Sequence, residues 1–193
     1  MLSAVRRSVG ARIPTLSAKI AAPLVTIPLT TSVYPSTMNT VSSRSSSTTT
    51  SAGGFKSFTH VFEVNTKNRM EFVNITKEVQ NYVTQSGIKE GILLCNTMHT
   101  SSSVFIDDAD EGLYKDFEGF ANRLAPWDPI EQYRHNINGE VNGAAHLQRT
   151  VFGREVTVAV TEGKLHLGKW ESIHYGEFDG KRAKKLLVKI IGH

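Results

Sequence analysis

The chain has 193 residues, with 22 basic and 18 acidic side chains, a formal net charge of +4 and a single cysteine, Cys95. One cysteine excludes an intramolecular disulfide framework and a cysteine zinc cluster, so a metal would have to be held mainly by histidine and carboxylate groups. No stretch approaches the roughly 20 consecutive apolar residues of a membrane span, which argues against a membrane partner.

The excess of positive charge lies at the N-terminus. Six basic residues precede Glu63 and no acidic residue does, whereas acidic residues outnumber basic ones in the rest of the chain. The basic balance is therefore a property of the leader and does not indicate nucleic-acid binding. An arginine-bearing leader rich in Ser and Thr is typical of a transit peptide, so we expect a mitochondrial protein. A chloroplast address and a disordered extension on a cytoplasmic protein are the alternatives.

A hydroxyl-rich segment follows the leader. Ten of the twelve residues from 40 to 51 are Ser or Thr, which cannot bury enough apolar surface to offset the entropy of ordering the chain. We therefore assign residues 1–53 to a transit peptide and a disordered Ser/Thr-rich linker, and residues 54–193 to one folded domain. A domain of that length forms a single core.

The folded region begins with a strand and a helix. Residues 58–64 alternate as a strand does when at least one of its faces is covered. Apolar residues then recur at helical spacing, and Gly87 supplies a stop just after them, which predicts a helix. The members of this stripe are Phe72, Ile75, Val79, Tyr82 and Val83.

Strands interrupted by shorter helices make up the rest of the domain. A helix is predicted at residues 111–124, which Pro126 prevents from continuing, and a short helical turn at residues 144–150. Strand pairs joined by short turns favour antiparallel sheet, and helices packed on it make the fold class α+β. The predicted strands are residues 91–96, 104–106, 155–161, 164–175 and 185–191.

Within residues 164–175, strict alternation places His166, Trp170 and His174 on one face of the predicted strand. Trp170 is expected to anchor a core or an interface, and the two histidines are expected to be structural.

Two polar segments near the middle of the chain are candidates for binding an anion or a cation. Thr100, Ser101 and Ser102 follow His99 at a strand end, where hydroxyls and backbone amides can wrap a phosphate or simply form a solvated turn. Asp107 and Asp108 precede a predicted helix. Their carboxylates can bind a divalent cation or favour the helix dipole, and both interpretations stay open.

Further candidates lie towards the C-terminus. His135 and His146 are eleven residues apart, a spacing that does not by itself indicate a metal site, so each is a candidate ligand or a hydrogen-bonded structural residue. Glu177 precedes a predicted turn and could orient a histidine. Arg182 is a candidate phosphate contact, with a surface salt bridge as the alternative.

Several of these segments together resemble the YjbQ-like family, also known as the secondary thiamine-phosphate synthase family, over roughly residues 56–192. The family usually has Asn-Glu where this chain has Asp107 and Asp108. The blocks that carry the resemblance are His99-Thr100-Ser101, His135-Asn136, Asn142-Gly143-Ala144-Ala145-His146-Leu147, Gly163-Lys164-Leu165, Leu167-Gly168-Lys169-Trp170-Glu171 and Glu177-Phe178-Asp179-Gly180.

The resemblance implies an antiparallel jelly-roll-like β-sandwich with one long helix and short helices packed on it, assembled as a homotrimer. It implies catalytic roles for His99, His135, His146 and Glu177. The three histidines could hold a divalent metal, zinc or magnesium, or act without metal as a general base and anion binders. The expected substrate contacts are Thr100, Ser101, Ser102, Asp107, Asp108, Asn142 and Arg182.

The activity that the resemblance implies joins hydroxymethylpyrimidine diphosphate to thiazole phosphate and releases diphosphate. We therefore expect an enzyme whose partner is a small phosphorylated metabolite. The alternatives are a metal-dependent hydrolase or phosphatase built on the histidines, and a phosphometabolite-binding module without turnover.

Overall fold

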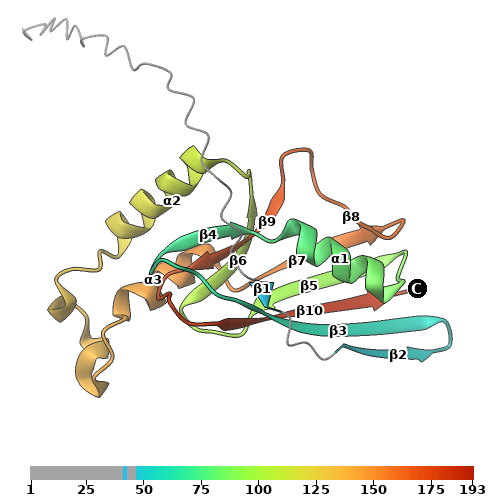
Figure 1. The fold of residues 1–193 in the computed structure, drawn as a ribbon, viewed down its shortest axis with the longest axis horizontal. Helices are drawn as coiled ribbons and strands as arrows, with labels where there is room; N and C mark the ends of the chain where they lie inside the picture. Colours follow the sequence, from blue (N-terminus) through green and yellow to red (C-terminus); the bar gives the residue numbers. More distant parts are fainter. Residues whose placement is uncertain (1–40, 43–46) are drawn as a thin grey trace, which may run out of the picture. The chain divides into compact units, whose positions relative to one another are not determined.

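The computed structural model describes residues 41–42 and 47–193, and the predicted transit peptide lies outside the described residues. Within this range the fold is α+β, with two antiparallel sheets and three α-helices (Figure 1). The α+β class and the antiparallel pairing predicted from the sequence are confirmed. A jelly-roll connectivity and a single long helix stay predictions.

The larger sheet provides most of the core. Its strand order is β1-β3-β10-β5-β7-β8, with β2 paired to the other part of β3. β10, in the middle, pairs antiparallel with both β3 and β5 along most of its length. The strands are β1 (Val41–Ser42), β2 (Thr48–Ala52), β3 (Phe55–Val64), β5 (Gly91–Thr97), β7 (Glu155–Thr161), β8 (Lys164–Leu165) and β10 (Lys184–Gly192).

The smaller sheet contains β4 (Glu71–Asn74), β9 (Ser172–Glu177) and β6 (Ser102–Asp107), in the order β4-β9-β6. The chain leaves the larger sheet at the end of β5 and enters the smaller sheet at the start of β6 (Figure 1). His99, Thr100 and Ser101 form this crossover. A polar turn is therefore held at both ends by strands of different sheets.

Three α-helices lie against the sheets: α1 (Thr76–Ser86), α2 (Glu111–Leu124) and α3 (Gly143–Phe152). Gly87 ends α1 in the left-handed conformation, with φ of 65°, as its position after the apolar stripe predicts. Asp110 begins α2 by accepting a hydrogen bond from the backbone N–H of Leu113 at 2.8 Å. Its carboxylate therefore caps the N-terminus of the helix.

The interior contains two apolar clusters, each of which packs helices against strands. The larger cluster packs α1 against strands of both sheets through residues such as Val79, Phe62 and Tyr175. The smaller cluster lies around Phe178 and joins β4 to α2 and α3 through Ala121 and Ala145. The second cluster holds α3 beside the C-terminal end of β9, where the polar residues described below converge.

The sequence prediction was wrong about two segments. The predicted strand at residues 164–175 is interrupted, because Glu171 turns back and its carboxylate accepts the backbone N–H of Gly168 at 2.6 Å. Trp170 lies in this break and is 67% exposed, so it anchors no core among the described residues. The helix begins at Thr76, after Phe72, because the side chain of Asn74 accepts the Thr76 N–H at 3.0 Å.

The hydroxyl-rich segment also differs from its prediction. Residues 48–52 form strand β2, which pairs with β3, although the sequence predicted disorder there. Threonine is β-branched and favours extended backbone, and an exposed edge strand needs no apolar side chains of its own. Ser47, just before β2, shares a hydrogen bond of 2.6 Å with Nδ1 of His60.

Cys95 is buried in β5 and carries a free thiol. Burial raises the pKa of this thiol to about 12, which suits the inert core role expected from the sequence. None of the helices in the described part of the chain is long and apolar enough to cross a membrane.

Candidate functional site

The crossover between the sheets is held by hydroxyl groups. Thr97 and Ser102, on the two strands that flank it, share a hydrogen bond of 2.5 Å between their side-chain oxygens. Thr97 Oγ1 also accepts the backbone N–H of His99 at 3.2 Å. Ser101 and Ser102 are fully buried, so their hydroxyls lie on the interior side of the turn. Thr100, the residue before them, is exposed.

Glu177, at the end of β9, is the buried acidic centre of the site. Its side chain is 1% exposed, and it forms an ion pair with Lys184. It accepts the hydroxyl of Tyr175 at 2.6 Å and the backbone N–H groups of Phe178 and Asp179 at 2.9 and 2.8 Å. These donors occupy both carboxylate oxygens, so the orientation of the Glu177 side chain is fixed.

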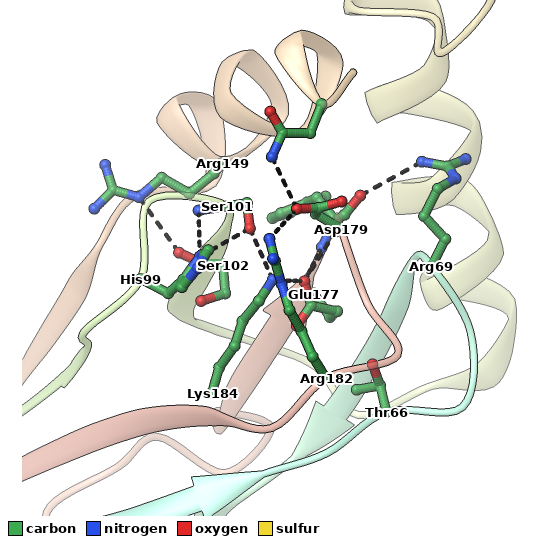
Figure 2. Close-up of polar contacts among 12 residues, drawn as sticks. Thr66, Arg69, His99, Ser101, Ser102, Arg149, Glu177, Asp179, Arg182 and Lys184 are labelled. Carbon is green, nitrogen blue, oxygen red and sulfur yellow. Dashed lines mark hydrogen bonds and ion pairs between the residues drawn. The ribbon is translucent and has the colours of Figure 1, made fainter. Parts of the chain in front are cut away.

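Lys184 connects Glu177 to the crossover. Besides the ion pair, its ammonium donates a hydrogen bond of 2.7 Å to Oγ of Ser101 (Figure 2). Burial lowers the pKa of Lys184, and the adjacent Glu177 opposes that effect. Lys184 was not among the site residues predicted from the sequence. A signal was available, because alternation along β10 places Lys184 on the buried face with Leu186 and Val188, where an unpaired lysine would be very unfavourable.

His99 is held by the residue two positions after it. Nδ1 of His99 lies 3.0 Å from Oγ of Ser101 and accepts the Ser101 backbone N–H at 3.3 Å. Partial burial lowers the pKa of His99, and the positive charges of Lys184 and Arg182 lower it further, while Glu177 and Asp179 raise it. Desolvation and the two cations prevail, so His99 is biased towards its neutral form.

His135 and His146 meet beside the crossover. Their ring centroids are 4.7 Å apart and the rings are nearly perpendicular. His135 lies in a 3₁₀ turn (Arg134–Asn138) and His146 in α3. The pKa of His146 is lowered by burial first and by His135 next, while Asp179 and a hydrogen bond to the backbone of Thr100 raise it. The last contact attaches this histidine pair to the same turn as His99.

A pocket of about 360 Å³ opens at the histidine pair. Gly143 is required in its wall, because a Cβ there would lie only 2.7 Å from the Cβ of Tyr133. A second short 3₁₀ turn (Ile130–Gln132) precedes this wall, and the Tyr133 hydroxyl donates a hydrogen bond of 2.5 Å to the backbone carbonyl of Pro126. The pocket is lined by Tyr133, Arg134, His135, Gly143, His146 and Leu147.

Asp179 binds two of the residues that were predicted to contact the substrate. One carboxylate oxygen accepts Nδ2 of Asn142 at 3.0 Å and a guanidinium nitrogen of Arg182 at 2.5 Å. Arg182 is therefore in the ion pair that the alternative interpretation expected, although its side chain remains 54% exposed. Asn142 is buried, and its Oδ1 has no hydrogen-bond partner among the described residues.

Asp107 and Asp108 lie away from this site. Ser102 aligns with Glu177 in the sheet, whereas Asp107, at the other end of β6, aligns with Ser172. Five residues of extended strand correspond to about 17 Å. Within one chain, the acidic pair therefore does not reach the crossover that carries His99.

The described residues contain no group of three or more His, Cys, Asp or Glu side chains placed to hold a metal ion. The structure brings His135 and His146 together but engages Nδ1 of His99 with Ser101. These residues do not fit a metal centre within one chain, and the predicted zinc or magnesium site stays a prediction.

Comparison with known proteins identifies relatives of this chain in one family. The family model described as UPF0047 protein YjbQ-like matches residues 60–193. A UPF0047 protein of Archaeoglobus fulgidus is 35% identical over 65% of this chain and 95% of its own length. YugU of Bacillus subtilis, also a UPF0047 protein, is 34% identical over 67% of this chain and 96% of its own length.

Solved structures agree with this assignment. A YbjQ-like protein of unknown function from Sulfolobus solfataricus superimposes with a TM-score of 0.67 at 32% identity, covering 72% of this chain and 99% of that one. A hypothetical protein from Aeropyrum pernix gives a TM-score of 0.65 at 30% identity, covering 70% and 98%. The chain belongs to the YjbQ-like UPF0047 family.

Proposed function

We propose that this YjbQ-like chain is an enzyme that acts on phosphorylated small molecules, and that it joins hydroxymethylpyrimidine diphosphate to thiazole phosphate with release of diphosphate. The observation that carries the proposal is the pocket whose lining includes Arg134 and the contacting pair His135 and His146. Its volume of about 360 Å³ lies in the range of small-molecule sites.

The chemistry of such a transfer calls for cationic and N–H donors. The thiazole nitrogen forms the new bond to the pyrimidine methylene carbon, the bond from that carbon to the diphosphate oxygen breaks, and negative charge develops on the departing diphosphate. Donors placed in advance around that group lower the barrier. Arg134 in the pocket, and Arg182 with its exposed guanidinium beside Asp179, are the charged donors that support this role.

The histidine pair supports proton transfer. Burial and the neighbouring His135 keep the pKa of His146 below its ordinary value, so a neutral imidazole is present at neutral pH. A neutral imidazole presents one N–H, which can donate a hydrogen bond or a proton to an oxygen of the departing diphosphate. Glu177 is fully buried, so its role is to hold Lys184, through the ion pair, and the backbone of Asp179, through a hydrogen bond.

Three further expectations belong to this proposal. We expect a homotrimer, which exposed apolar side chains on α2 and α3, among them Leu124, Leu147 and Val151, would help to assemble. A divalent metal is expected to bind together with the diphosphate, and the protein is expected in mitochondria.

An assay with both phosphorylated substrates tests the function. The expected result is a condensed product and diphosphate in equal amounts, formed only when both substrates are present. Diphosphate or phosphate released from one substrate alone, with water consumed, would instead establish the hydrolase. A rise in melting temperature with these compounds and no turnover would establish the binding module.

A further inference from the structure

The hydrogen bonds around His99 determine which ring nitrogen carries the proton. The backbone N–H of Ser101 can only donate, so Nδ1 of His99 must be the acceptor of that 3.3 Å bond. In a neutral imidazole, one nitrogen accepts and the other bears hydrogen. Neutral His99 therefore carries its proton on Nε2.

The Ser101 hydroxyl strengthens this assignment. Its oxygen accepts a hydrogen bond from the Lys184 ammonium at 2.7 Å, which leaves its own hydrogen free to point at Nδ1 of His99, 3.0 Å away. A lysine ammonium has donors only and cannot reverse the direction. The buried ion pair with Glu177 holds that ammonium in place (Figure 2). Every hydrogen bond in this series therefore has the same direction: Lys184 donates to Ser101, and Ser101 donates to His99.

Nε2 of His99 is free to meet a ligand. Among the described residues it forms no hydrogen bond, and it is absent from the buried side-chain atoms without partners, so it reaches solvent. An N–H group in this position seeks an acceptor oxygen. At His99 the electrostatic effects of Lys184 and Arg182 are larger than the opposing effects of Glu177 and Asp179, which makes an anionic acceptor favourable there.

We propose that His99 is a neutral hydrogen-bond donor, through Nε2–H, to an oxygen of an anionic phosphate-type ligand, and that Ser101 and Lys184 are the positioning residues that hold it in this tautomer. The inference rests on the proposed function in taking the anion to be the diphosphate of that reaction. It also excludes His99 as a metal ligand through Nε2, because metal binding there would move the proton to Nδ1, against the Ser101 N–H.

Nuclear magnetic resonance of the ¹⁵N-labelled full chain reports the tautomer directly. At a pH where the imidazole is neutral, the wild-type protein should show His99 as the Nε2–H form. Ser101→Ala and Lys184→Met remove the hydroxyl donor or its support but keep the Ser101 backbone N–H, so each should raise the Nδ1–H share measurably while Nε2–H stays the major form. Ser103→Ala is the matched control, because Ser103 is equally buried but donates to the carbonyl of Arg149. An Nδ1–H form in the wild type, or a tautomer unchanged in both test variants, overturns the proposal.

Binding of inorganic diphosphate in metal-free buffer tests the donor. In His99→Gln the amide nitrogen occupies the place of Nε2, whereas in His99→Asn it occupies the place of Nδ1. We expect His99→Asn to weaken binding about tenfold or more and His99→Gln to stay within about threefold of wild type, the difference of one hydrogen bond to a charged group. Equal losses in the two variants overturn the proposal.

These measurements do not depend on turnover. If the tautomer and the contrast between Gln and Asn are found but the two substrates are never joined, the proposed reaction is wrong and the donor role of His99 stands. If product forms but His99 has the other tautomer, the proposed reaction stands and the donor role is wrong.

Discussion

Lys184 and Glu177 form an ion pair in which each side chain is only 1% exposed. The Lys184 ammonium of this pair also donates a hydrogen bond to Oγ of Ser101. Two charges removed from water are tolerated only when each has its partner and its remaining hydrogen bonds are satisfied. This arrangement makes Lys184 both a structural residue and a support of the candidate site.

Replacing one member of the pair should therefore be costly. Lys184→Met leaves a buried carboxylate without its cation, and we expect a loss of about 3 kcal/mol in the free energy of unfolding, measured by urea denaturation. Lys185→Met, next to it but exposed, should change stability by less than about 0.5 kcal/mol. Similar stability of the two variants would show that the pair contributes little.

His135 and His146 should be needed for turnover but not for the stability of the fold. His135→Ala and His146→Ala are expected to reduce turnover by about 10²-fold, the lower range of acid–base contributions, while the melting temperature stays close to wild type. His174→Ala provides the contrast, because His174 is fully buried beside Tyr114. It should lower stability by about 0.5 to 3 kcal/mol and spare the specific activity of the folded fraction. Wild-type turnover in both pair variants would remove the histidines from the mechanism.

Stability should depend on pH through buried neutral histidines. Burial lowers the pKa of His174 below its ordinary value of 6.5, although hydrogen bonding to the backbone of Ser172 and the charges of Asp107 and Asp108 oppose this. The unfolded chain then binds more protons, so the stabilisation is complete above about pH 6.5 and is lost as the pH falls through the folded-state pKa.

Thermal unfolding across this pH range measures the effect. The pKa values of His60, His99 and His146 are lowered by burial too and should add to the slope. His174→Gln should flatten the fall in melting temperature on acidification. Cys95→Ala should lower stability equally at every pH, because the Cys95 thiol does not titrate there. A stability that rises on acidification would contradict the conclusion that burial keeps these histidines neutral in the folded protein.

Truncation should locate the start of the fold. A variant beginning at Ser47 retains β2 and the hydrogen bond to His60, whereas one beginning at Gly54 loses both. We expect the first to melt like the full chain and the second to melt about 3 °C lower, because an exposed edge strand contributes on the order of 1 kcal/mol. Equal melting temperatures would mean that β2 adds nothing to stability.

Metal binding should depend on the anion. Because the described residues offer no group of three ligands, we expect magnesium or zinc to bind stoichiometrically only when inorganic diphosphate supplies further oxygens. Equilibrium dialysis with and without diphosphate, followed by metal analysis, measures this. Tight zinc binding without diphosphate that is lost in His99→Gln would instead establish a site made of the three histidines.

Local features of the chain were predicted well wherever a few neighbouring residues decide the structure. The apolar run at residues 91–96 forms β5, and the helix predicted at residues 111–124 is observed over the same residues. Gly87 ends α1 as expected. The segment at residues 164–175 was predicted poorly, because the alternation that suggests one strand also fits a turn closed by the carboxylate of Glu171.

The sequence by itself determined which residues form the polar crossover, because His99, Thr100 and Ser101 lie between two apolar runs that must become strands. Only the tertiary structure decided what surrounds it. It brings Lys184 to Ser101, 83 residues away, and leaves Asp107 at the far end of β6. Strand register and packing between sheets create these contacts, and they depend on the whole core, whereas sequence spacing reports only neighbours along the chain.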